Sequence, residues 1–264
     1  MEPAQPRLAI PARLAAGLLG LAAGAGALII AEGPGRATTY AGSSVSGAAL
    51  SLSAGLALIA AGLVICLGTS PRRNGDLALV AGFTWFAPVW AAWQNGPPLI
   101  PSLAMVVGGF TFPLIVHLVL AYPGGRASSA PARALIAAAY AGALLAAAVL
   151  ALFRDPYFDP GCLANCNVNV FVVHSLPSLA RAAEIAGRWF TVAAAAGLIA
   201  ICAARLLAGS QPARRRLLPV AIPAIMFAGT VAARAIALQR ITLERYVITE
   251  RVSRQRVDSP WEWS

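Results

Sequence analysis

Hydrophobic residues gather in seven stretches along this chain, and short polar segments separate them. Each stretch is close to the roughly 20 apolar residues that an α-helix needs to cross the hydrocarbon core of a bilayer. The pattern predicts seven membrane-spanning helices, over residues 10–31, 47–68, 77–93, 101–122, 134–153, 189–207 and 217–238. The expected fold class is therefore all-α, a polytopic membrane helical bundle that occupies residues 1–238.

Composition supports a membrane protein and excludes a soluble domain. The chain is 59% hydrophobic and 11% charged, with a mean hydropathy of +0.73, whereas soluble domains are about 25% charged. The net charge of +10 comes from 20 basic residues, all arginine. In a soluble protein such a charge would indicate nucleic acid as a partner. In a multispan protein it is typical of cytoplasmic turns that face anionic lipid headgroups, so the expected partner is the bilayer.

The distribution of arginine predicts the orientation. With a cytoplasmic N-terminus, ten arginines fall on the cytoplasmic side and four on the external side, as the positive-inside rule requires of a multi-pass plasma-membrane protein. Seven spans then place the polar tail, residues 239–264, outside, where five more arginines weaken the count. Either an eighth span is missing at the C-terminus, or one of the seven is wrongly assigned.

The longest polar interval, residues 154–188, is predicted to be an external loop and is the first candidate for detecting something outside the bilayer. It contains Cys162, Cys166, His174 and Asp159. Two cysteines four residues apart can form a disulfide outside the membrane. They could instead act as redox-responsive thiols, or bind a soft metal with the histidine and the aspartate. We favour the disulfide and predict neither a metal site nor a cofactor.

Two of the ionisable residues inside predicted spans are candidate functional groups. His117 in the fourth span is either a functional intramembrane group or a neutral imidazole that bonds to a neighbouring helix. Arg234 in the seventh span is close enough to the external end for its guanidinium to reach the interface. The three tryptophans at one end of the third span are expected to form an interfacial belt, with packing inside the bundle as the alternative.

The turn after the fourth span has a simple structural explanation. Pro123 ends the helix, Gly124 and Gly125 permit unusual dihedral angles, and Arg126 anchors the cytoplasmic face. No nucleotide-binding loop, nucleophile elbow, metalloprotease motif or pair of carboxylates occurs in the sequence. Nothing in the chain therefore predicts a catalytic residue.

The same turn carries a family resemblance. Residues 117–126 read His-Leu-Val-Leu-Ala-Tyr-Pro-Gly-Gly-Arg, and Tyr140 follows in the next span. Further on come the two cysteines of the external loop and then Asn169, and Pro-Arg-Arg-Asn precedes the third span. Together these residues resemble the membrane-embedded sensor region of actinobacterial sensor histidine kinases over roughly residues 70–260. The resemblance implies a multispan sensory input region in which the cysteine pair is a shared feature.

The chain departs from that family in three respects. Three residues separate the cysteines where two are expected, and Asn167 stands where a proline is expected. The family also continues into an eighth span and a kinase region, which this sequence lacks, so kinase activity is not implied. We therefore expect an input module of two-component signal transduction. The alternatives are a small transporter or channel, and an accessory subunit that packs against itself or a partner membrane protein.

Overall fold

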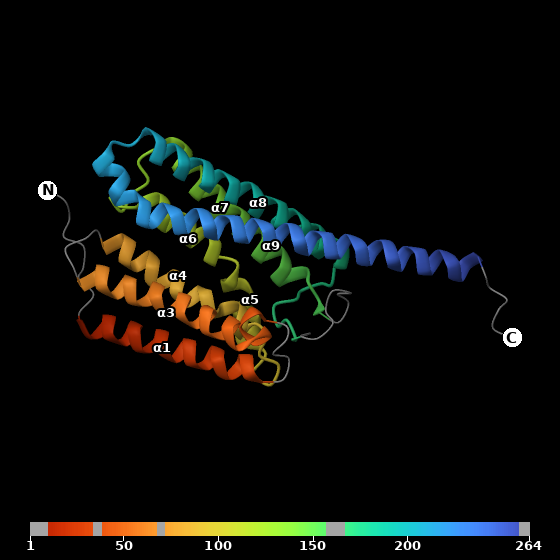
Figure 1. Cartoon of the computed structure of the whole chain (residues 1–264). Helices are drawn as coiled ribbons and strands as arrows, with labels where there is room; N and C mark the ends of the chain where they lie inside the picture. Colours follow the sequence, from red (N-terminus) through yellow and green to blue (C-terminus); the bar gives the residue numbers. More distant parts are fainter. Residues whose placement is uncertain (1–9, 34–38, 68–71, 157–166, 259–264) are drawn as a thin grey trace.

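The computed structural model describes residues 10–33, 39–67, 72–156 and 167–258. These residues form α-helices joined by turns, with no strand among them. The helices are α1 (Ile10–Glu32), α2 (Tyr40–Ser43), α3 (Val45–Leu67), α4 (Arg72–Trp90), α5 (Leu99–Gly108), α6 (Thr111–Ala121), α7 (Ala130–Phe153), α8 (Pro177–Ala208) and α9 (Gln211–Asp258). The long helices lie side by side in a bundle (Figure 1). This confirms the predicted all-α helical bundle.

Six helical segments of the described chain are long and apolar enough to cross a membrane: Ala15–Glu32, Val45–Cys66, Leu99–Ala121, Ala130–Phe153, Pro177–Ala208 and Gln211–Arg240. They identify a multi-pass membrane protein. The remaining predicted span, 77–93, corresponds to α4, a helix of 19 residues that begins with polar residues. Because neighbouring helices bury much of α4, its surface need not be as apolar as that of a helix in contact with lipid.

The closest helix packing in the bundle is between α3 and α4. A Cβ atom on Gly62 would lie 2.8 Å from the carbonyl oxygen of Gly75, and one on Gly75 would lie 2.9 Å from that of Gly62. A second contact lies seven residues away on each helix, where a Cβ on Gly82 would lie 3.1 Å from the carbonyl oxygen of Gly55. The two backbones therefore touch at two levels, which only residues without a side chain allow.

The predicted fourth span is divided into α5 and α6 by a break at Gly109 and Phe110. The break faces another irregularity, Pro88 inside α4. Proline has no N–H, so it leaves the carbonyl of Thr84, four residues earlier, without its helical partner. Thr111, the first residue of α6, donates its hydroxyl to that oxygen over 2.8 Å. The break thus places a donor where α4 lacks one.

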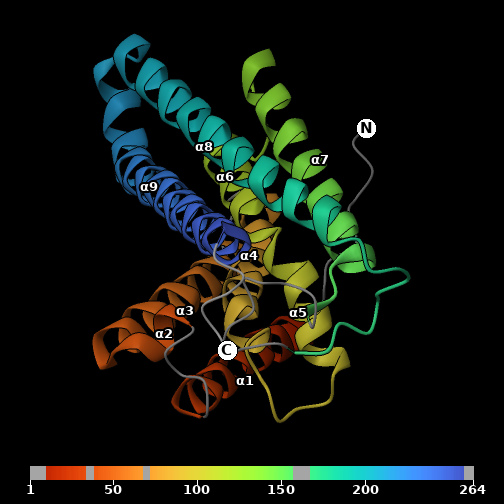
Figure 2. The ribbon, with the colours of Figure 1, turned by 90° about the vertical axis from the view of Figure 1, so that its right-hand side faces the viewer.

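Three buried clusters hold the helices together. One joins α1, α3 and α4 through residues such as Ala27, Ile59 and Phe86. A second joins α6 to α7, α8 and α9, and a third joins α4 to α6 through Ala81, Leu114 and Ile115. Seen along the bundle, α4 to α6 lie between α1 and α3 on one side and α7 to α9 on the other (Figure 2). The broken span is therefore at the centre of the molecule.

Two helices are longer than the hydropathy pattern predicts. α8 begins at Pro177, twelve residues before the predicted start at residue 189, so the second part of the interval 154–188 is helix rather than loop. Proline at the first position and the alanines that follow favour this helix, although too many polar residues are present for hydropathy to reveal it. α9 continues through the predicted polar tail to Asp258 and projects beyond the bundle (Figure 1).

The bundle has two distinct ends (Figure 1). At the first, called the turn end, α1, α4, α7 and α9 begin, and residues 122–129 and 209–210 connect helices. At the second, called the loop end, α1 and α7 finish and residues 167–176 lead into α8; α9 emerges there.

The tryptophans of the third predicted span pack inward. The indole N–H of Trp85 donates to the Ser51 carbonyl of α3 at 2.9 Å, and that of Trp90 donates to the Ala23 carbonyl of α1 at 3.1 Å. Both rings also contact the buried clusters, and Trp90 meets Trp93 edge to face. The predicted interfacial belt is therefore wrong for Trp85 and Trp90, since their indole groups bond to helices within the bundle.

Candidate functional site

A single buried amide fixes the loop end of the bundle. The side chain of Asn169 is only 8% exposed. Its Nδ2 donates to the carbonyl groups of Leu150, Ala151 and Arg154 at 3.3, 2.9 and 3.0 Å. The last four carbonyls of an α-helix have no partner further along the helix, although the Leu150 carbonyl also accepts the backbone N–H of Arg154 at 3.1 Å. Asn169 therefore caps the end of α7 from outside the helix, and its Oδ1 accepts the N–H of Phe171 at 3.1 Å.

The same segment is attached to two other helices. Asn167 donates Nδ2 to the Ala91 carbonyl at the end of α4, over 2.7 Å. In α5, the hydroxyl of Ser102 lies 3.1 Å from the Val168 carbonyl and accepts the N–H of Val170 at 3.1 Å. Ser102 is 2% exposed, so these bonds form in a dry environment where a lost partner is costly. Residues 167–170 are thus tied to α4, α5 and α7 at once.

A chain of charged and polar groups continues from α7 to α9. Nε of Arg154 lies 3.5 Å from Oε1 of Glu184 in α8. Oε2 of Glu184 lies 3.4 Å from Nη2 of Arg188, one turn further along α8. Arg188 also donates Nη1 to Oε1 of Gln239 in α9 at 3.4 Å. Each of the three charged side chains keeps about a quarter of its surface exposed, so each contact alone contributes modestly.

The loop end therefore contains one connected set of contacts, from residues 167–170 through the end of α7 to α8 and α9. We call it the loop-end network: Ser102, Arg154, Asn167, Asn169, Glu184, Arg188 and Gln239. Its geometry supports mechanical coupling between elements. Among the described residues it holds no cluster of three metal-ligating side chains.

The predicted sensing residues lie around this network. Cys162, Cys166 and Asp159 fall outside the described residues, between the described positions Pro156 and Asn167. His174 is exposed, and its backbone N–H points to the Leu152 carbonyl at 3.4 Å. The disulfide, the redox-responsive thiols and the metal site therefore stay predictions.

The two candidates within the spans have different surroundings. His117 in α6 bonds through Nδ1 to the Tyr140 hydroxyl of α7 at 3.3 Å, and the two rings meet edge to face at 5.8 Å. The imidazole is thus paired with a neighbouring helix. Arg234 is exposed on α9, about 7 Å along the helix from Gln239 at 1.5 Å per residue. Its guanidinium can reach the level of the loop-end network.

At the turn end the predicted turn has a defined shape. The Tyr122–Pro123 peptide is cis, and Gly125 has a φ of 74°, a conformation that favours glycine. The N–H of Gly125 closes the turn on the Ala121 carbonyl at 2.8 Å. Buried Asn74 at the start of α4 donates Nδ2 to the Pro123 carbonyl at 3.3 Å. Gly124 and Arg126 are exposed, so the turn is joined to the bundle through Pro123 and Gly125.

Sequence reasoning gave no role to most of the network. Asn74 and Asn169 belong to the stretches that carry the family resemblance, but the bonds of both residues depend on helices distant in sequence. Ser102, Glu184 and Gln239 gave no signal beyond their polarity next to apolar stretches. No protein-family model, curated protein or solved structure matches the chain.

Proposed function

We propose that this chain is the input module of a membrane sensory protein, in which the segment around Cys162 and Cys166 detects a condition at the loop end and α9 carries the response. The observation that carries the proposal is the continuity of the loop-end network. Residues directly after Cys166 bond to the ends of α4 and α7, and α7 connects through Glu184 and Arg188 to Gln239 of α9.

The shape of α9 suits it to transmit a change. Nineteen residues of the helix follow Gln239, up to Asp258. At 1.5 Å per residue they extend roughly 28 Å from the bundle. A small rotation at Gln239 would be carried along this rod to whatever contacts its far end. A stimulus acts if it stabilises one of two arrangements of the network more than the other.

The mechanism requires contacts that can be exchanged at low free energy. The ion pairs of Glu184 are partly exposed, and such pairs contribute about 0–1 kcal/mol each. Asn169, by contrast, is buried and bonded four times. We infer that Asn169 keeps the loop attached to α7 while the Arg154–Glu184–Arg188 contacts rearrange.

The test measures whether the loop and α9 are coupled. The full chain in lipid nanodiscs is oxidised or reduced, and hydrogen–deuterium exchange is followed in residues 235–258. We expect the exchange of α9 to differ between the two states in the unaltered chain. The difference should be lost in the double variant Cys162→Ser/Cys166→Ser and in Gln239→Leu, which removes the acceptor of Arg188.

The matched control is Cys66→Ser/Cys202→Ser, which alters the two buried cysteines of α3 and α8 and should keep the response. If hydrogen–deuterium exchange in α9 is the same in the oxidised and the reduced unaltered chain, the cysteine pair is excluded as the sensor. A response that survives Gln239→Leu would exclude the loop-end network as its route.

A small transporter or channel is the second candidate, and one observation favours it. The span made of α5 and α6 is broken at the centre of the bundle, and discontinuous helices often form substrate sites in transporters. Here, however, the hydroxyl of Thr111 bonds to the Thr84 carbonyl across the break. Solute flux in reconstituted vesicles that is lost on His117→Ala would favour this candidate over the sensory module.

A further inference from the structure

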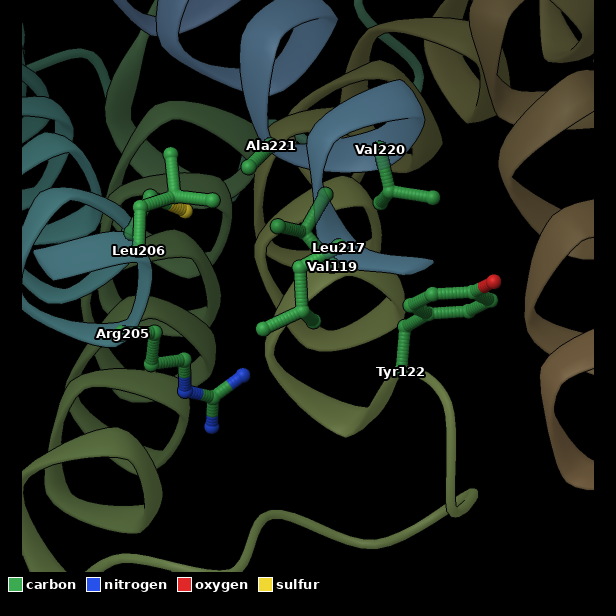
Figure 3. A pocket seen from close by; sticks show the side chains of 8 residues that line it. Val119, Tyr122, Arg205, Leu206, Leu217, Val220 and Ala221 are labelled. Atoms are coloured by element: carbon green, nitrogen blue, oxygen red, sulfur yellow. The ribbon is translucent and has the colours of Figure 1, made fainter. Parts of the chain in front are cut away.

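A shallow groove opens at the turn end between α6, α8 and α9 (Figure 3). Its walls are apolar side chains, chiefly Val119, Leu206, Leu217 and Val220, and its polar groups come from Arg205 and Tyr122. The enclosed volume is only about 10 Å³, roughly the space for one water molecule. A compact soluble ligand cannot enter it, so any occupant must lie along its open side.

The groove spans the depth at which lipid headgroups meet acyl chains. Tyr122 directly follows α6, and Arg205 is three residues from the end of α8. Val119 and Val220 lie about one turn or more further into their helices. Arginine and tyrosine at the ends of spans are typical of the membrane interface. The polar part of the groove is therefore at headgroup level and the apolar part at the level of the chains.

Arg205 is held at the mouth of this groove. Its Nη2 donates to the Leu120 carbonyl at the end of α6 over 3.0 Å. A guanidinium has five N–H donors, and this is the one hydrogen bond of the side chain within the described part of the protein. In Figure 3 the guanidinium lies on one side of Val119 and Leu217, and the ring of Tyr122 lies on the other. Donors thus remain for an anion beside an apolar surface.

The charge of the turn end matches an anionic ligand. The described side chains there include one acid, Asp76, and seven arginines: Arg73, Arg126, Arg133, Arg205, Arg214, Arg215 and Arg216. At the loop end, by contrast, five described arginines accompany three acids, Glu32, Asp155 and Glu184. Basic pockets between spans are suited to acidic lipid headgroups. Among the described residues, Arg205 is the one arginine that lines the groove.

We propose that the groove is a binding site for one anionic phospholipid of the leaflet at the turn end. The phosphate is bound by the guanidinium of Arg205, and one acyl chain lies over Val119, Leu217 and Val220. Such a lipid would bridge α6, α8 and α9. The site does not depend on the sensory role proposed above and would be present whether or not the loop end responds to a stimulus.

The test uses native mass spectrometry of the full chain in a neutral detergent, with equal amounts of phosphatidylglycerol and phosphatidylcholine of the same acyl chains. We expect one phosphatidylglycerol to be retained in preference to phosphatidylcholine. Arg205→Gln should weaken its binding about tenfold, because a charge-assisted bond to the phosphate is lost. Arg133 is an exposed arginine at the same end but outside the groove, so Arg133→Gln should change the binding of phosphatidylglycerol less than about twofold.

A second variant keeps the test decisive if Arg205→Gln disturbs folding. Val220→Trp fills the apolar wall but keeps Arg205 and its bond to Leu120, and it should also abolish the preference. If Arg133→Gln and Arg205→Gln weaken phosphatidylglycerol binding equally, the lipid is attracted by the general positive charge of the turn end and not by a specific site. Unchanged retention in Val220→Trp, or full competition by glycerol phosphate without acyl chains, would likewise overturn the proposal.

Discussion

Several buried or half-buried polar side chains in this bundle bond to backbone carbonyls at the ends of helices or opposite a proline. Asn169 does so at the end of α7, Arg205 at the end of α6, and Thr111 opposite Pro88. In a dry interior an unpaired carbonyl is unfavourable. These side chains therefore fix where helices end and bend, which hydropathy alone does not specify.

Asn169→Asp should be the most destabilising single change at the loop end. The variant keeps the size of the side chain but replaces a donor with a carboxylate that faces three carbonyl oxygens. We expect a loss of about 3 kcal/mol in the free energy of unfolding, measured by steric trapping in bicelles. Asn167→Asp is the control; with one bond and partial exposure, it should lose about 1 kcal/mol. Equal losses would contradict this account of Asn169.

Thr111→Val should destabilise the bundle only while Pro88 is present. The variant is nearly isosteric but removes the donor to the Thr84 carbonyl, and we expect a loss of about 1–2 kcal/mol. Thr111→Ser keeps the hydroxyl and should lose less. Pro88→Ala restores the helical N–H, so Thr111→Val should be nearly neutral in that background. A double-mutant cycle measures this coupling, and additive effects would show that the two positions are independent.

At the scale of elements, the pair α3 and α4 is defined by glycine rather than by large side chains. Gly55 faces Gly82 and Gly62 faces Gly75, so the same seven-residue spacing occurs on two antiparallel helices. The spacing is visible in the sequence. It did not identify the contact because glycine is abundant throughout this chain, with 24 residues.

Gly62→Ala should therefore separate α3 from α4. The new methyl group would lie 2.8 Å from the Gly75 carbonyl oxygen and from the Leu79 nitrogen, and backbone atoms cannot move aside easily. We expect a loss of about 1–3 kcal/mol in the free energy of unfolding, again by steric trapping. Gly229→Ala, where no atom lies within 4 Å of the added carbon, should be neutral or stabilising by up to about 1 kcal/mol. A neutral Gly62→Ala would show that the helices are not in close contact.

At the scale of the whole molecule, the sequence predicts the bundle better than the site. Apolar stretches of sufficient length identify membrane helices because the bilayer leaves few other structures for them. Hydropathy detects segments that are apolar enough to lie in lipid, and it does not detect helices with many polar residues. The start of α8 at Pro177 and the continuation of α9 to Asp258 were therefore not predicted.

The candidate site depends on contacts that no local pattern encodes. Arg188 and Gln239 are 51 residues apart, and Asn167 and Ala91 are 76 residues apart. The sequence shows only that polar residues are present near helix ends. Which of them meet is decided by how α5, α7, α8 and α9 pack.

The composition of α4 has a consequence for biosynthesis. A translocon selects segments for the membrane largely by their apolarity, and α4, which begins with Arg72, Arg73, Asn74 and Asp76, is less apolar than the six segments named above. We predict that α4 integrates only after α3 has emerged and can pair with it through the glycine contacts. Glycosylation mapping in microsomes should show α4 inserted when it follows α3, and translocated when α3 is replaced by an unrelated apolar helix. In this protein a helix contact would then act before folding, as the step that decides the topology of the nascent chain.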